Sequence, residues 1–220
     1  MKTLLSLGDC NTLGIHENYK NAYPEKFANM INHKCINCGF TMSTCKEGLN
    51  FFNDTFNDQT QVLTIQYGLV DSWNTFKYSP YILYYPDNFL RKILRKIIKK
   101  YKKICRKWYL HKFFGEKNVI SKNEYYNNIS SILMQCKNQR IILIDTVPNL
   151  DTTRNNNIKI YNKILDDIAL KYPNCRRLYL YDYFLNNTKK LYLADGTHIN
   201  NLGHNYIAEQ LKELYENWDY

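Results

Sequence analysis

The sequence predicts an α/β protein built on a five-stranded parallel sheet with helices on both faces. Short apolar runs alternate with stretches of helical spacing along nearly the whole chain, as in folds that wind strands and helices in turn. The run Arg140–Asp145 is almost entirely apolar, which is typical of a parallel strand buried on both faces. At 220 residues, 45% of them hydrophobic, the chain can form a full core, and we predict one domain over residues 1–220.

The first half of the chain supplies three strands and two helices. Pro24 suits the first turn of a helix, and Thr44 is a typical helix cap. The predicted strands are Lys2–Leu7, Lys34–Asn37 and Gln61–Tyr67. The predicted helices are Tyr23–Ile31 and a helix that Thr44 caps and that runs through Leu49 to Phe52.

The second half supplies the remaining elements, and its helices carry apolar residues at helical spacing on one face. The predicted helices are Lys122–Cys136, Asn155–Tyr172 and Leu202–Trp218. The predicted strands are Arg140–Asp145 and Arg177–Leu180, and the segment Tyr181–Leu193 is expected to be irregular.

The basic charge is concentrated in one segment. Eleven Lys or Arg and no Asp or Glu lie between Arg91 and Lys112, so the remaining chain carries 10 − 11 = −1. Ile, Leu, Tyr and Trp fall on the opposite helical face. We therefore predict a basic amphipathic helix of about 24 residues within an insertion at 87–114.

Three interpretations of this helix are open. It could pack on the core with a solvated cationic face, or lie on an anionic membrane surface. It could also dock an acidic polymer, such as a polyanionic glycan or a nucleic acid. Nucleic acid is disfavoured because basic residues do not cluster elsewhere in the chain.

Candidate catalytic residues lie at opposite ends of the chain. The first apolar run leads into Gly8-Asp9-Cys10, and Asp195-Gly196-Thr197-His198 precedes the last helix. Ligands of open α/β sheets bind at the carboxyl ends of the strands. A cysteine nucleophile needs a base, and the base needs an orienting partner. We therefore predict a triad of Cys10, His198 and Asp195.

Gly8-Asp9-Cys10 and Asp195-x-x-His198 resemble the two signature motifs of the SGNH/GDSL hydrolases, a superfamily of esterases and acyltransferases, with Cys in place of Ser. The resemblance implies a flavodoxin-like three-layer α/β/α fold. It also implies hydrolysis or transfer of an acyl group through an acyl-Cys10 intermediate without a cofactor. The substrate class that it implies is a small-molecule or saccharide ester, such as a glycan or glycan precursor.

The same resemblance implies an oxyanion hole and a set of supporting residues. The Cys10 N–H and the N–H of Met42 or Gly39 are the expected donors, although Met42 stands where the family has a second glycine. Val70 replaces the family's oxyanion Asn. Asp9, Asn11, Gly68 and Asp71 are expected to line or brace the pocket.

These departures leave an alternative function open. A catalytically degraded relative could serve as a membrane-surface or glycan-binding module through the segment Arg91–Lys112.

The cysteines point to neither a metal site nor a disulfide framework. Cys35-x-x-Cys38, with Cys45 and His33 nearby, has no second spaced pair, and structural zinc sites usually have two. We expect no metal. Met1–Leu7 is too short for a signal-peptide core, so we expect a cytoplasmic protein with reduced thiols. A peripheral position at the inner face of the membrane is also compatible with the basic segment.

Overall fold

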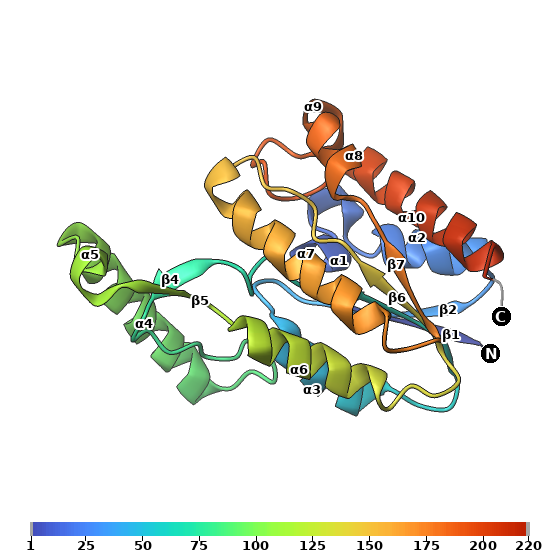
Figure 1. Ribbon diagram of the computed structural model, residues 1–220, viewed down its shortest axis with the longest axis horizontal. Helices are drawn as coiled ribbons and strands as arrows, with labels where there is room; N and C mark the ends of the chain where they lie inside the picture. The colour runs from blue at the N-terminus through green and yellow to red at the C-terminus, as the bar shows by residue number, and fades with distance from the viewer. Residues whose placement is uncertain (1, 219–220) are drawn as a thin grey trace.

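The computed structural model describes residues 2–218, with only the backbone of His111, and its centre is a five-stranded parallel sheet (Figure 1). The strand order is β2-β1-β3-β6-β7. The strands are β1 (Thr3–Gly8), β2 (Lys34–Gly39), β3 (Thr60–Gln66), β6 (Arg140–Ile144) and β7 (Cys175–Leu178). The predicted α/β fold class, with five parallel strands, is confirmed.

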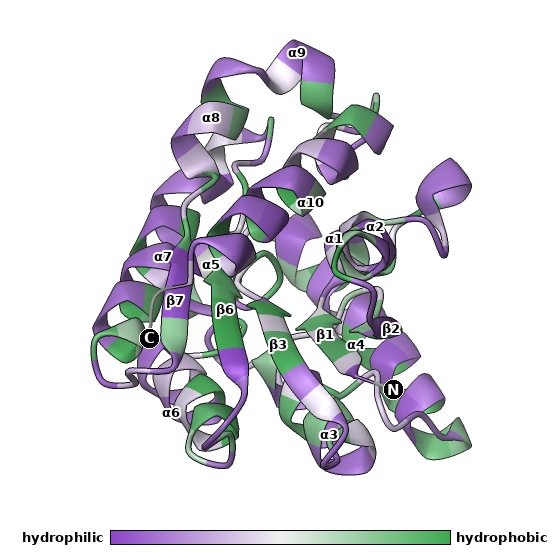
Figure 2. Cartoon of the chain, turned by 90° about the vertical axis from the view of Figure 1, so that its right-hand side faces the viewer, coloured by the Kyte–Doolittle hydropathy of each residue, from purple (hydrophilic) through white to green (hydrophobic). Residues whose placement is uncertain are grey.

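Helices cover both faces of this sheet. One layer consists of α3 (Cys45–Thr55), α6 (Lys122–Leu133) and α7 (Asn155–Ala169). The other layer is formed mainly by α2 (Tyr23–Met30) and α10 (Asn201–Glu216). Because successive strand residues point to opposite faces, Leu5 and Leu63 join the first core and Leu4 and Val62 join the second. In Figure 2 the interior strand β6 is hydrophobic along most of its length, as burial on both faces requires.

The segment after β7 differs from its prediction. Residues expected to be irregular form two short helices, α8 (Tyr181–Asn186) and α9 (Thr188–Leu191). The Asp145 carboxylate, which follows β6, accepts hydrogen bonds from the N–H groups of Leu180 and Tyr181 at 3.0 and 3.2 Å. The start of α8 is thus stabilised by a residue in the loop after β6, which no local sequence pattern indicates.

Residues 74–118 form an arm that extends beyond the carboxyl-terminal edge of the sheet (Figure 1). It contains the strand pair β4 (Asn74–Phe76) and β5 (Glu116–Asn118), the long helix α4 (Phe89–Lys107) and the short helix α5 (His111–Phe114). The basic amphipathic helix has 19 residues. The three-residue strands were not predicted, because strands this short carry no readable alternation.

Candidate functional site

Cys10 lies where the order of the sheet reverses. The chain passes from β1 outward to β2 and then returns to β3 on the other side of β1, so the loops after β1 and β3 diverge. Asp9 caps the short helix α1 (Cys10–Leu13) by accepting a 2.9 Å hydrogen bond from the Asn11 N–H. A Cβ at Gly8 would lie 1.9 Å from Thr12 Oγ1, so this sharp turn excludes a side chain.

Asp195 and His198 form a close pair on the loop before α10. Asp195 Oδ2 lies 2.6 Å from His198 Nδ1. Its other oxygen accepts the backbone N–H groups of Thr197 and His198 at 2.8 and 2.9 Å. Burial raises the pKa of Asp195, but the hydrogen bonds from His198 and Thr197 outweigh it and hold that pKa below its ordinary value. The pair leaves His198 Nε2 as the ring nitrogen available for proton transfer.

Asn11 joins the two ends of the chain at this site. Its side-chain amide donates to the Thr197 carbonyl at 3.3 Å and accepts from the Ile199 N–H at 3.1 Å. These contacts flank His198 on both sides, and Asn11 itself follows Cys10. Asn149, in the loop after β6, adds a 3.0 Å hydrogen bond to the Thr197 hydroxyl. The sequence motifs thus meet through a buried asparagine rather than through a direct hydrogen bond, since among residues 2–218 none joins Cys10 to His198.

The Cys10 thiol lies in a mostly apolar surrounding. It is only 6% exposed and packs with Leu69, Ile158 and Tyr181, which come from three separate parts of the chain. Burial, reinforced by the neighbouring Asp9 carboxyl, raises the pKa of the Cys10 thiol well above its ordinary value. Cys10 therefore rests as a thiol, which would need a base before it could act as a nucleophile.

The loop after β2 lies against the turn that carries Cys10. The Phe40 N–H and the Ser43 hydroxyl both donate to the Gly8 carbonyl, at 3.1 and 2.9 Å. Between them, Met42 has a positive φ of 63°, a conformation that favours glycine. Its N–H makes no hydrogen bond within the described part of the chain. The Gly39 N–H, in contrast, already donates to Asn37 Oδ1 at 2.8 Å.

The loop after β3 is held by Asp71. This buried carboxylate accepts the Gly68 N–H at 3.1 Å and the Cys45 N–H at 2.9 Å, which ties β3 to the start of α3. Val70, in the same loop, is buried and offers no side-chain donor. Among residues 2–218, no three His, Cys, Asp or Glu side chains are grouped closely enough to hold a metal ion.

Some residues of this site were not identified from the sequence. Asn149 reaches Thr197 only through the tertiary fold, and so does the apolar wall of Leu69, Ile158 and Tyr181 that packs on Cys10. The one sequence signal for Asn149 is its position just after a buried strand, at the sheet edge where ligands bind.

The chain is a three-layer α/β/α protein, and it shares this architecture with solved structures of GDSL-type hydrolases. The structure superposes on a lipase/acylhydrolase from Enterococcus faecalis with a TM-score of 0.68 and 16% identity, covering 100% of this chain and 98% of that one. A member of the lipolytic protein G-D-S-L family from Veillonella parvula gives a TM-score of 0.64 and 12% identity, covering 99% and 100%.

A catalytic mutant of an acetylxylan esterase from Geobacillus stearothermophilus gives a TM-score of 0.65 and 18% identity, covering 99% and 95% of the two chains. No protein-family model and no curated protein sequence matches this chain. At these identities the comparisons establish the shared fold.

Proposed function

We propose that this protein is an ester hydrolase or acyltransferase that works through an acyl-Cys10 intermediate. The observation that carries this proposal is the Asp195–His198 pair, joined by Asn11 to the turn that presents Cys10. The fold shared with lipolytic and acetylxylan-esterase structures supports the same class of reaction.

In the proposed reaction His198 Nε2 takes the thiol proton as Cys10 Sγ forms a bond to the ester carbonyl carbon. The tetrahedral intermediate then expels the alcohol oxygen, which receives that proton from His198. Water or an acceptor alcohol next attacks the thioester, with His198 acting as base again, and free Cys10 returns. Asp195 orients the imidazole throughout.

The Cys10 and Met42 N–H groups are the proposed donors to the oxyanion. Gly39 is left out because its N–H is already bonded to Asn37. Val70 supplies no third donor, and loss of one such donor raises the barrier by about 2.7–4 kcal/mol in a known protease. We therefore expect slow turnover on alkyl esters and faster acylation by thioesters or activated esters.

The rate of p-nitrophenyl acetate cleavage tests the triad. His198→Ala should lower kcat/KM by about 10²–10⁴-fold because the thiol loses its general base, and Cys10→Ala should abolish the burst of product. His33→Ala, which lies just before β2 at the opposite edge of the sheet from Cys10, is the matched histidine control and should leave the rate unchanged. Equal rates in wild type and His198→Ala would contradict the proposed base. Acetylated xylo-oligosaccharides are the first saccharide esters to compare.

A further inference from the structure

The apolar side of α4 is not covered by the rest of the protein. Cys105 is its one buried residue among those described. Leu90 is 70% exposed and Ile97 is 57% exposed. The exposed apolar residues continue past the helix through the turn and α5, where Trp108 is 66% and Phe113 84% exposed. Of the three interpretations of this helix, packing on the core therefore does not account for most of its apolar face.

The cations of α4 have almost no acidic partners. Asp87 pairs with Arg95 at 2.6 Å and with Lys92 at 3.6 Å. No ion pair within residues 2–218 involves the other eight cations of the helix: Arg91, Lys96, Lys99, Lys100, Lys102, Lys103, Arg106 and Lys107. Burial, with repulsion from Arg106 and Lys117, lowers the pKa of Lys102, as expected inside an uncompensated cluster.

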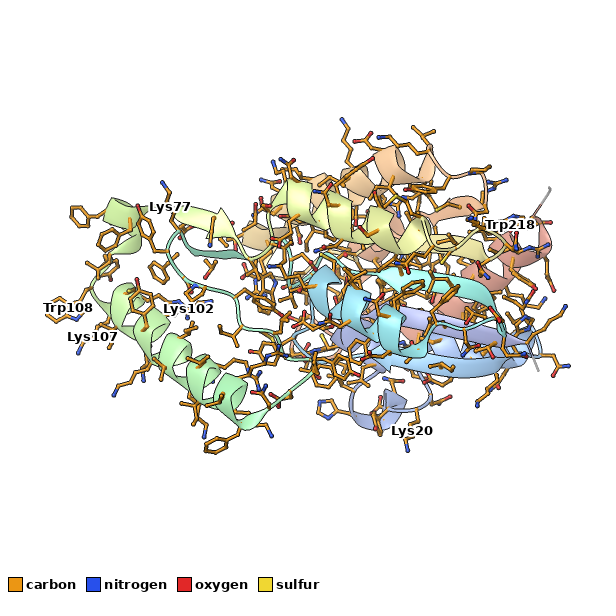
Figure 3. All side chains as sticks on the ribbon, turned by 90° about the horizontal axis from the view of Figure 1, so that it is seen from below. Lys20, Lys77, Lys102, Lys107, Trp108 and Trp218 are labelled. Atoms are coloured by element: carbon orange, nitrogen blue, oxygen red, sulfur yellow. The ribbon has the colours of Figure 1, made fainter. Side chains whose placement is uncertain are left out.

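The side of α4 that contacts the rest of the arm lies between the apolar and basic faces of the helix. Arg95 donates to the Leu83 carbonyl and stacks on Tyr84 at 4.6 Å. Lys102 approaches Lys117 of β5. Both the apolar face and much of the basic face are therefore open to solvent, and Figure 3 shows Lys107 and Trp108 at the outer end of the arm, far from Trp218.

We propose that α4 and the turn after it bind in the plane of an anionic lipid membrane. An interfacial helix buries an apolar face among acyl chains while its Lys and Arg contact the headgroups, and this helix exposes both kinds of face. Within the described chain, no helix is long and apolar enough to span a bilayer. The in-plane orientation is therefore the one that fits α4.

Charge and hydrophobicity together favour lipid over the other partners. A second copy would bring two clusters of unpaired cations together, and the remaining chain, with a net charge of −1, does little to neutralise them. A nucleic acid would contact the Lys and Arg but leave the aliphatic face exposed to water. The arm extends from the sheet edge that carries Cys10, so membrane binding brings this edge near the lipid surface (Figure 1).

Vesicle flotation of the full chain tests this proposal without any measurement of catalysis. We expect the protein to float with vesicles in which phosphatidylglycerol replaces about a third of the phosphatidylcholine, and to float at least about tenfold less with phosphatidylcholine alone. The emission of Trp108 should shift to shorter wavelength on the anionic vesicles, and Trp108→Phe should remove that shift.

Two variants separate the charge from the apolar face. Lys96, Lys99, Lys103 and Lys107 all changed to Gln, or Leu90, Ile97 and Ile104 all changed to Ser, should each weaken binding by about tenfold or more. All these positions are exposed, so both variants should keep the fold. The matched control changes four exposed lysines on other surfaces to Gln, namely Lys34, Lys137, Lys189 and Lys190, and should bind like wild type.

Several results would overturn the proposal. If the control variant lost as much vesicle binding as the variant with four lysines of α4 changed, net charge alone would attract the protein to the vesicles. Unchanged binding in the Leu90, Ile97 and Ile104 variant would show that the apolar face does not enter the lipid. A single-stranded oligonucleotide could displace the protein from vesicles and bind the Leu90, Ile97 and Ile104 variant as tightly as wild type. That result would assign the arm to nucleic-acid binding.

Discussion

Asn11 is the residue on which the geometry of the candidate site depends most. It bridges the turn after β1 to the loop that holds His198, and both of its contacts are to backbone groups beside that histidine. The sequence motifs alone predict the nucleophile, base and orienting carboxylate. They do not show what brings them together, because the bridge joins positions 186 and 188 residues apart in the chain.

Asn11→Ala should slow ester cleavage by up to about 10²-fold, since a small displacement of the base is enough to lose that much. Thr153→Ala, an exposed polar-to-Ala change elsewhere, is the control. A variant with wild-type cleavage rates would show that Asn11 does not position His198.

At the scale of elements, the regular sheet and its covering helices were predictable, whereas the arm was predictable only in part. Strands β1, β3 and β6 carry apolar runs long enough to recognise, and Thr44 caps α3 as predicted. The pair β4–β5 and the helices α8 and α9 depend on contacts made by distant residues. The helix α4 was evident from its periodicity, but its open apolar face follows only from the structure.

The base of the arm is fixed to α3 by one buried carboxylate. Glu47 Oε1 accepts the Tyr81 hydroxyl at 2.9 Å and the Tyr84 N–H at 2.7 Å, and Oε2 accepts the Thr44 N–H at 2.9 Å. We expect Glu47→Ala to lower the free energy of unfolding by about 3 kcal/mol, because it strands buried donors.

Urea unfolding measures this loss. Glu124→Ala is the matched control, since its ion pair with Lys46 is exposed and such pairs contribute about 0–1 kcal/mol. Equal losses in the two variants would contradict the role of Glu47 as an anchor.

At the scale of the whole molecule, two buried carboxyl groups link stability to pH. Burial raises the pKa of Asp9 and of Asp71 from 3.8 to about 7. The folded state therefore binds more protons than the unfolded chain between these values. This contribution to stability is fully present below the unfolded pKa and is lost as pH rises through about 7. His204, whose pKa burial lowers to about 3, acts in the opposite direction at acid pH.

We expect the free energy of unfolding to fall between about pH 5 and about pH 8, and to fall less in Asp71→Asn, in which that group no longer titrates. Urea unfolding at the two pH values measures this difference. The exposed Asp182→Asn serves as the control and should keep the wild-type slope. An identical slope in Asp71→Asn would mean that this carboxyl titrates normally in the folded protein.

The measurement that tests the central claim most directly is intact-protein mass spectrometry after brief exposure to p-nitrophenyl acetate, followed by peptide mapping. We expect a single acetyl adduct on Cys10 in wild type. Cys10→Ala should form no rapid adduct, and His198→Ala should form the Cys10 adduct far more slowly. Acetylation of Cys10 no faster than that of the other six cysteines, or at the same rate without His198, would contradict an acyl-Cys10 mechanism.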